Sequence, residues 1–125
     1  MKIRTSPLDR LFSRYIRLRD KGICQRCGKY KGLTQGLDCA HYHSRRKGNT
    51  KYDEDNCLAL CSPGCHQYFE ENPKEFDQFM LYRLGQERYD MLEHRARQVG
   101  KPDKKAIELY LKQEIKELKE EGGRG

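Results

Sequence analysis

The sequence has no run of 18 or more apolar residues, and its N-terminal stretch MKIRTSPLDR lacks the apolar segment of a secretory signal. The first absence argues against a membrane-spanning helix, because such a helix needs about 20 apolar residues. The second leads us to expect a protein that stays inside the cell, where cysteines remain reduced. The chain also lacks internal repeats, and its 125 residues suit one domain with a modest core.

Acidic residues are scarce in the first part of the chain. Residues 1–52 contain 14 Lys and Arg but only 3 Asp and Glu, a net charge of +11, whereas residues 53–125 carry a net charge of −4. A basic half of this kind suits a polyanionic partner such as nucleic acid. The alternative is a basic face that is merely solvated, but that alternative leaves the uneven distribution unexplained.

The six cysteines of a chain without a secretion signal favour metal binding over a disulfide framework. Cys24 and Cys27 are separated by two residues, and Cys61 and Cys65 by three. A tight turn between paired cysteines can aim both sulfurs at one ion, and four thiolates leave that ion no open position. We therefore predict one structural Zn²⁺ bound by these four residues, which would also stabilise a small, highly charged domain.

Two further thiols, Cys39 and Cys57, remain outside this set. We expect both to be free and buried, since free cysteine often behaves as a small hydrophobic residue. The alternatives are that Cys57 replaces Cys61 in the zinc site and that Cys39 joins it.

The patterns along the chain predict an α+β fold. Ser6 and Pro7 are suited to the start of a helix, and Gly22 to its end. We expect helices over residues 7–21, 65–71, 74–84, 86–98 and 102–121, a strand within 37–43, a basic turn at 45–51 and a return segment over 52–60. We divide the chain into a zinc-bound domain with its N-terminal helix, residues 1–73, and a helical region, residues 74–125.

The last of these helices has a narrow apolar stripe, formed by Ile107, Leu111, Ile115 and Leu118. Such a stripe packs either on the chain's own helices or on a second copy of the chain. Of the two, we predict a homodimer formed through this helix.

Three residues interleaved with the cysteine pairs, His41, Asn56 and His66, are the candidate catalytic group. A strand, a return segment and a helix start would bring them to one place. Phosphodiester hydrolysis needs a group that takes a proton from water and a cation near the scissile phosphate. A histidine held by a second group fits the first task, and a histidine or carboxylate with Mg²⁺ fits the second. Asn56 would orient an imidazole or brace the returning loop through its amide.

These residues resemble the HNH endonuclease superfamily. More narrowly, the segment HYHSRRKGNTKYDEDN followed by Cys61 is similar to the phage NinG, or Rap, recombination endonucleases. The similarity extends from about Ile23 to Leu92. It implies a small zinc-bound ββα-metal unit of treble-clef type and a metal-dependent enzyme that cuts branched DNA such as Holliday junctions. It also implies a cytoplasmic location in a bacterial host cell.

The resemblance assigns roles to individual residues. His41 would be the general base, Asn56 the middle Asn, and His66 a ligand of the catalytic cation, Mg²⁺ with Mn²⁺ as an alternative. Many HNH enzymes have a metal ligand directly before the catalytic histidine, where this chain has Ala40. We expect a replacement ligand among three candidates: Asp38, His43 and Asp53, with Asp53 the first choice.

The basic turn between the two arms of the motif contains Arg45, Arg46, Lys47 and Lys51. Arginine and lysine suit phosphate oxygens, so we expect these side chains to contact the DNA backbone. The alternative is a solvated turn. An alternative function follows from Ala40: without a catalytic cation the protein would be a zinc-stabilised DNA-binding module that does not cut.

Overall fold

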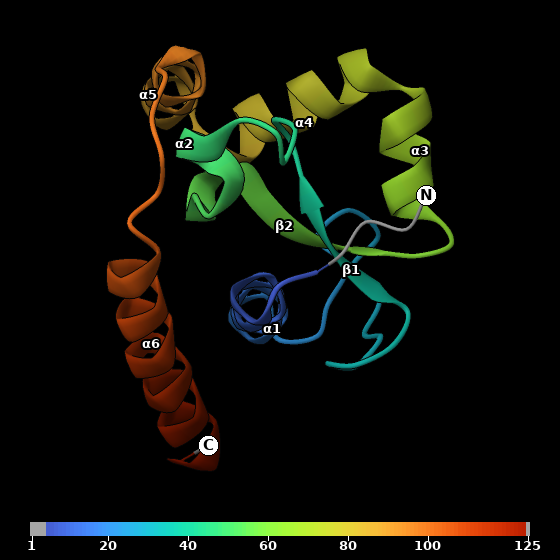
Figure 1. Ribbon diagram of the computed structural model, residues 1–125. Coiled ribbons are helices and arrows are strands. Elements are labelled where there is room, and N and C mark those ends of the chain that lie inside the picture. Colours follow the sequence, from blue (N-terminus) through green and yellow to red (C-terminus); the bar gives the residue numbers. More distant parts are fainter. Residues whose placement is uncertain (1–4, 125) are drawn as a thin grey trace.

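The computed structural model describes residues 5–124 and has an α+β fold in which helices surround a two-stranded sheet (Figure 1). Its elements are α1 (Pro7–Arg19), β1 (Leu37–His41), α2 (Gly48–Lys51), the 3₁₀ helix η1 (Glu54–Asn56), β2 (Cys57–Cys61), α3 (Cys65–Glu71), α4 (Pro73–Leu84), α5 (Gln86–Arg97) and α6 (Lys104–Arg124). Among the helices within this range, none has the length and apolar character needed to cross a membrane.

The central feature is the antiparallel hairpin of β1 and β2, in which Leu37 lies opposite Cys61 and His41 opposite Cys57. Every residue of β2 is buried, because helices cover both faces of the hairpin (Figure 1). On the α3 face, Ala40 and Leu58 pack with residues of α3, α4 and α5. On the α1 face, Cys39 and Cys57 pack with residues of α1 and α6. A strand covered on both sides needs a continuous apolar sequence, which explains CLALC.

Helix α1 begins as the sequence predicts. The Ser6 hydroxyl accepts a hydrogen bond from the Asp9 backbone N–H, and the Asp9 carboxylate accepts one from the Ser6 N–H, so two end groups of the helix are satisfied. The helix ends at Arg19, two residues before the predicted end. Lys21 and Gly22 have positive φ angles of 59° and 72°, a conformation that cannot continue a right-handed helix.

The apolar stripe of α6 packs against α1 within the same chain. Leu111 and Ile115 are buried in a cluster with Phe12 and Ile16 of α1, and the two helices lie side by side (Figure 1). Intramolecular packing is therefore what the structure shows for this stripe. The homodimer stays a prediction, and it would need another surface or separation of α6 from α1.

The remaining helices follow the sequence prediction within three residues at each end, and α3 matches residues 65–71. The basic turn contains the short helix α2, and the return segment contains η1 before β2. Met80, Leu84 and Leu92 from the C-terminal region pack with Leu58 and Leu60 of β2. Both hydrophobic clusters thus include residues from either side of residue 73, and the division into regions 1–73 and 74–125 stays a prediction.

Candidate metal centre and active site

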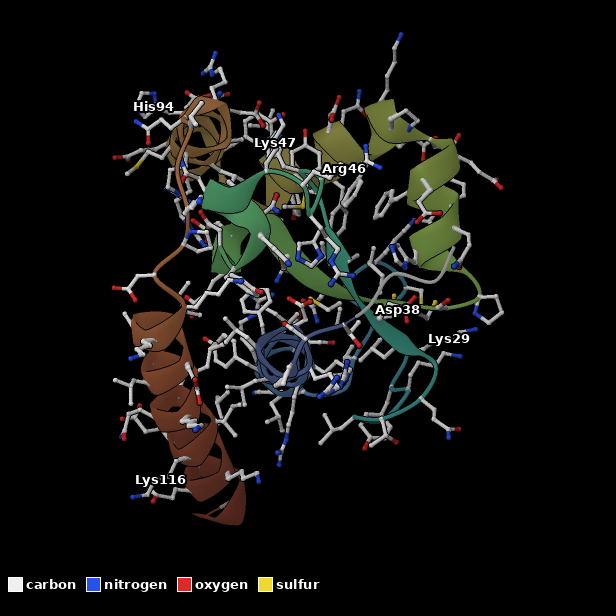
Figure 2. All side chains as sticks on the ribbon, viewed as in Figure 1. Lys29, Asp38, Arg46, Lys47, His94 and Lys116 are labelled. Carbon is white, nitrogen blue, oxygen red and sulfur yellow. The ribbon has the colours of Figure 1, made fainter. Side chains whose placement is uncertain are left out.

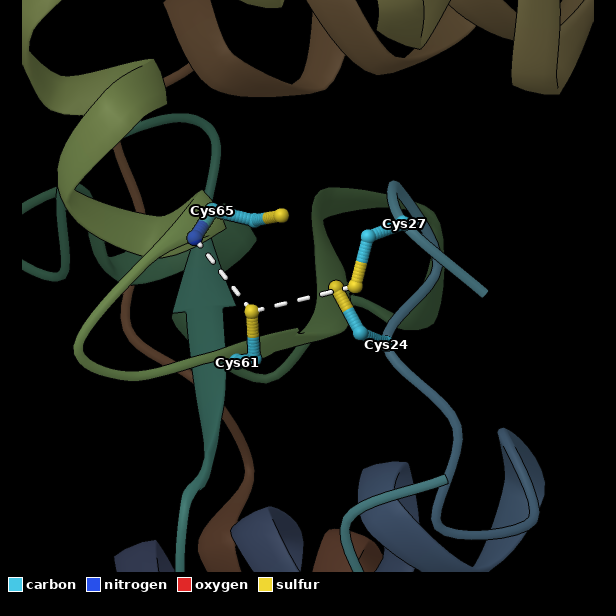
Figure 3. Close-up of side chains that lie close together, drawn as sticks. All are labelled: Cys24, Cys27, Cys61 and Cys65. Carbon is cyan, nitrogen blue, oxygen red and sulfur yellow. Dashed lines mark hydrogen bonds between the residues drawn. The ribbon is translucent and has the colours of Figure 1, made fainter. Parts of the chain in front are cut away.

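The four predicted zinc ligands lie together at one end of the hairpin. Cys24 and Cys27 come from the loop after α1, Cys61 ends β2 and Cys65 begins α3 (Figure 3). Their sulfur atoms all lie within 4.8 Å of one another. The Cys27 and Cys61 sulfurs are 3.9 Å apart, near the roughly 3.8 Å between neighbouring ligands around a tetrahedral ion with Zn–S bonds of about 2.3 Å. The cluster can therefore hold a structural metal such as zinc.

Backbone geometry prepares this cluster. Gly64 has a φ of 146°, and a Cβ at this position would lie only 2.9 Å from the Cys61 sulfur. The Cys65 N–H donates to that same sulfur at 3.4 Å. Burial alone would raise the pKa of Cys24, but backbone hydrogen bonds from Cys27 and Cys61 outweigh burial and lower this pKa to about 6. The surroundings of Cys24 thus favour a thiolate, the form that binds metal.

His66, on the first turn of α3, lies between two carboxylates. Its Nδ1 is 2.8 Å from Asp38 of β1, and its Nε2 is 3.4 Å from Glu70, one helical turn later. Of the three candidate replacement ligands, Asp38 is thus the one that lies beside His66. Glu70 was not predicted from the sequence, although its spacing of four residues from His66 on a predicted helix could have indicated this contact. Carboxylate oxygens suit a hard divalent cation such as Mg²⁺.

His41 is held in one orientation on the α1 face of the hairpin. Its Nε2 lies 2.9 Å from the Lys51 carbonyl oxygen. A carbonyl oxygen can only accept a hydrogen bond, so Nε2 carries a hydrogen and Nδ1 of the neutral ring has a free lone pair. Burial lowers the pKa of His41 below its ordinary value. The ring therefore remains neutral at neutral pH and can accept a proton.

A hollow of about 260 Å³ opens beside His41. Three arginines line it, Arg10, Arg17 and Arg45, together with the carboxylate of Asp9. Guanidinium groups around a neutral imidazole form a site that suits an anionic phosphodiester.

The structure does not bring His41 and His66 together, contrary to the expected convergence on one place. Successive side chains of a strand point to opposite faces. His41 lies on the α1 face, 6.2 Å from the Phe12 ring by ring centroids. Asp38, the partner of His66, is three positions away and points toward α3. The sequence motif places both histidines near one hairpin, but the pleat separates them.

Asn56 braces the loop that leads from β1 to β2. Its side chain is fully buried; Oδ1 accepts a hydrogen bond from the His43 N–H, while Nδ2 donates to the carbonyl oxygens of His43 and Thr50. The sequence allowed two roles for Asn56, orienting an imidazole or bracing the returning loop. These contacts correspond to the bracing role. A catalytic role for Asn56 stays a prediction.

The other two candidate metal ligands have partners on α5. Asp53 accepts two hydrogen bonds from the Arg95 guanidinium, at 2.6 and 3.2 Å, and caps η1 through the Asp55 N–H. His43 lies 2.7 Å from the Glu93 carboxylate. Each ties the β1–β2 connection to a helix about 40 to 50 residues further along the sequence. That Asp53 is the replacement ligand of the catalytic cation therefore stays a prediction. The geometry does not favour it, because Arg95 already occupies the Asp53 carboxylate.

The basic turn divides into two pairs. Arg45 and Lys51 form ion pairs with the buried Asp9, at 3.2 and 3.3 Å. Arg46 and Lys47 are exposed and project from the loop before α2 (Figure 2). Asp9 was not singled out from the sequence. Two of the four expected DNA contacts thus also have an internal partner, while Arg46 and Lys47 face solvent.

The two remaining cysteines form no disulfide. Cys57 is buried, as expected, but Cys39 is only half-buried because its side chain lines the hollow on the α1 face. Neither belongs to the four-cysteine cluster, so the alternatives in which Cys57 replaces Cys61 or Cys39 joins the zinc site do not apply.

A family described as Bacteriophage Lambda NinG protein matches residues 4–121 of the chain. Neither the curated proteins nor the solved structures contain a significant match.

Proposed function

The chain belongs to the NinG family of phage proteins, and from this premise we propose that it is a metal-dependent DNA endonuclease of phage recombination. Its proposed substrate is branched DNA such as a Holliday junction, and its proposed location is the cytoplasm of a bacterial host. The family suggests a recombination function. The chemistry proposed for it depends on the residues around the hairpin.

The observation that carries the proposal is the state of His41. Its Nε2 is fixed by the Lys51 carbonyl, and burial lowers its pKa, so its other nitrogen is available as a base. A general base within reach of a water can accelerate hydrolysis by about 10²–10⁴-fold. The hollow beside it is lined by Arg10, Arg17 and Arg45, which would bind the phosphate that the activated water attacks.

A catalytic Mg²⁺ or Mn²⁺ would be held by one His66 nitrogen together with the carboxylate beside it, either Asp38 at Nδ1 or Glu70 at Nε2. The two carboxylates lie on opposite sides of the His66 ring, so one ion would use one of them, and water would supply its other oxygen ligands. When bound, the cation supplies positive charge to a phosphate. Arg46 and Lys47, both exposed, would contact the DNA backbone, and the four-cysteine cluster would hold a structural zinc.

A second candidate function is a zinc-stabilised DNA-binding module without catalysis. It is favoured by the separation of His41 and His66 on opposite faces of the hairpin, together with the buried Ala40 in the position of a usual metal ligand. In this alternative the basic surface and the zinc site keep their roles, and the histidines are structural.

Incubation of the full chain with DNA separates the two functions. We expect Mg²⁺-dependent cleavage of a labelled four-way junction, slower cleavage of matched duplex and single-stranded DNA, and none with EDTA. His41→Ala should lose cleavage and keep junction binding, whereas His94→Ala, at an exposed position of α5, should behave as wild type. Binding without cleavage in both Mg²⁺ and Mn²⁺ would favour the non-catalytic module.

A further inference from the structure

A second group of metal-binding side chains lies apart from the four-cysteine cluster. The ligand atoms of Cys39, His41 and Cys57 all lie within 4.8 Å of one another. The strand register explains why: Cys39 and His41 are two positions apart on β1, and Cys57 pairs with His41 across the hairpin, so all three point to the α1 face. The proposed nuclease mechanism uses only His41 of the three.

The orientation of His41 is the one that metal-binding histidines adopt. Such a histidine usually donates the hydrogen of one ring nitrogen to a carboxylate or backbone carbonyl, and binds the metal through the other nitrogen. Here Nε2 donates to the Lys51 carbonyl at 2.9 Å. The remaining nitrogen, Nδ1, is therefore free to bind an ion.

The two thiols determine which ions suit the group. Two sulfurs and one imidazole nitrogen form a soft donor set, which selects ions such as Zn²⁺ and Co²⁺ over Mg²⁺. Around a tetrahedral zinc the ligand atoms would lie about 3.5–3.8 Å apart. The separations here are at most 4.8 Å, so they exceed the tetrahedral spacing by no more than about 1 Å, a change that side-chain rotation can supply.

The group also has room for a fourth ligand. Cys39 and His41 both line the hollow of about 260 Å³ on the α1 face, whereas Cys57 is buried beneath. An ion bound here would keep one position open toward the hollow, where water or an anion could complete its coordination. Three protein ligands with an open position distinguish this group from the closed four-cysteine cluster.

We propose that Cys39, His41 and Cys57 form a second metal site, which binds a thiophilic divalent ion such as Zn²⁺ reversibly. Binding releases the proton of each thiol, since the metal takes thiolates. One consequence rests on the proposed function: an ion on Nδ1 occupies the nitrogen that would otherwise act as the base, so the zinc-loaded form of this site cannot cleave by that route.

Cobalt titration of the full chain tests the site without DNA. The protein is first loaded with one equivalent of Zn²⁺, which fills the four-cysteine cluster and resists displacement because zinc binds more tightly than cobalt. Co²⁺ is then added. Sulfur-to-cobalt charge-transfer bands in the near ultraviolet can arise only from the two cysteines left over from the six, Cys39 and Cys57.

We expect one equivalent of Co²⁺ to produce these bands in the wild type. Cys39→Ala should weaken binding at least tenfold, and His41→Ala should do the same while changing the visible ligand-field bands. His94→Ala and His43→Ala, which remove other histidines, should leave the titration unchanged. Cys39 is half-buried, so its alanine variant should fold even if a substitution at buried Cys57 does not.

Absence of charge-transfer bands in the zinc-loaded wild type would overturn the proposal, as would unchanged bands in Cys39→Ala. The readout requires no cleavage, so it is independent of whether the protein proves to be a nuclease. If the chain binds cobalt at this site but cuts no DNA, the result supports the second metal site and refutes the proposed nuclease function.

Discussion

The two cysteine-containing regions of this protein differ in what surrounds their sulfurs. The cluster of Cys24, Cys27, Cys61 and Cys65 has four ligands and backbone N–H groups directed at sulfur, as at Cys61. The group of Cys39, His41 and Cys57 has three ligands and faces a hollow. A closed set of ligands suits a structural ion, whereas an open set suits exchange or chemistry. We therefore expect a stabilising site and a reactive site close together on one small hairpin.

The largest difference between these regions should appear in stability. A structural zinc site contributes roughly 10–16 kcal/mol of apparent binding energy, against about 5–15 kcal/mol for the whole stability of a domain. Cys24→Ser should therefore leave the chain largely unfolded and without tightly bound zinc. Cys39→Ser should remain folded and keep about one zinc ion per chain. Metal analysis after dialysis and circular dichroism would measure both. A folded wild type without zinc would refute the structural site.

The next largest effect concerns the brace between the strands. Asn56→Ala removes three hydrogen bonds made by a fully buried side chain. It leaves the His43 N–H and carbonyl without this partner, whereas the Thr50 carbonyl still accepts from the Asp53 N–H. Each such loss costs about 1–3 kcal/mol, so we expect a destabilisation of about 3 kcal/mol or more in urea unfolding. Asn72→Ala, which removes one half-buried hydrogen bond, should cost about 1 kcal/mol. Equal effects of the two substitutions would contradict the bracing role.

A smaller, pH-dependent effect belongs to Asp9. Burial opposes ionisation of this carboxylate, but hydrogen bonds from Tyr52 and Ser6 and the charge of Lys51 outweigh burial and lower its pKa to about 2. Because the folded-state pKa is lowered, its stabilisation is present above about pH 4 and is lost as the pH falls toward about 2. Asp9→Asn should cost about 2 kcal/mol at pH 7 and progressively less in acid.

Urea unfolding across this pH range measures the Asp9 effect. Asp90→Asn, at an exposed position of α5, serves as the matched control and should change stability little at any pH. A constant difference between wild type and Asp9→Asn from pH 7 to pH 2 would show that the carboxylate charge contributes nothing.

The smallest effect should appear in DNA binding. Arg46 and Lys47 are exposed and lie far from Lys116 on α6 (Figure 2). Each phosphate contact contributes about 0.9 to the slope of log affinity against log salt concentration. Replacing both with Ala should reduce that slope by about 2, while Lys116→Ala should not change it. An unchanged slope in the double variant would place the DNA on another surface.

Features that depend on neighbouring residues could be predicted from the sequence. The capping of α1 by Ser6, the pairing of cysteines by short spacings and the helix at residues 65–71 each follow from a few adjacent positions. The strand around His41 was also predicted from its alternation. These local rules explain why the order of the predicted elements and the clustering of the four cysteines agree with the sequence prediction.

Features set by distant partners could not be predicted in this way. Asp53 pairs with Arg95 and His43 with Glu93, and neither pairing leaves a sign in the local sequence. The face to which His41 points depends on which helix covers each side of the hairpin, a tertiary property. For the same reason the stripe of α6 gave no indication that α1 would cover it.

The most direct test of the account is a Mg²⁺ titration of four-way-junction cleavage under single-turnover conditions. The proposed base, His41, lies on the α1 face of the hairpin, and the proposed cation ligand Asp38 lies on the α3 face. Asp38→Ala should therefore raise the Mg²⁺ concentration for half-maximal rate by about 10-fold or more. His41→Ala should keep that concentration and lower the maximal rate by at least about 100-fold. Cleavage by His41→Ala at the wild-type rate would contradict the account.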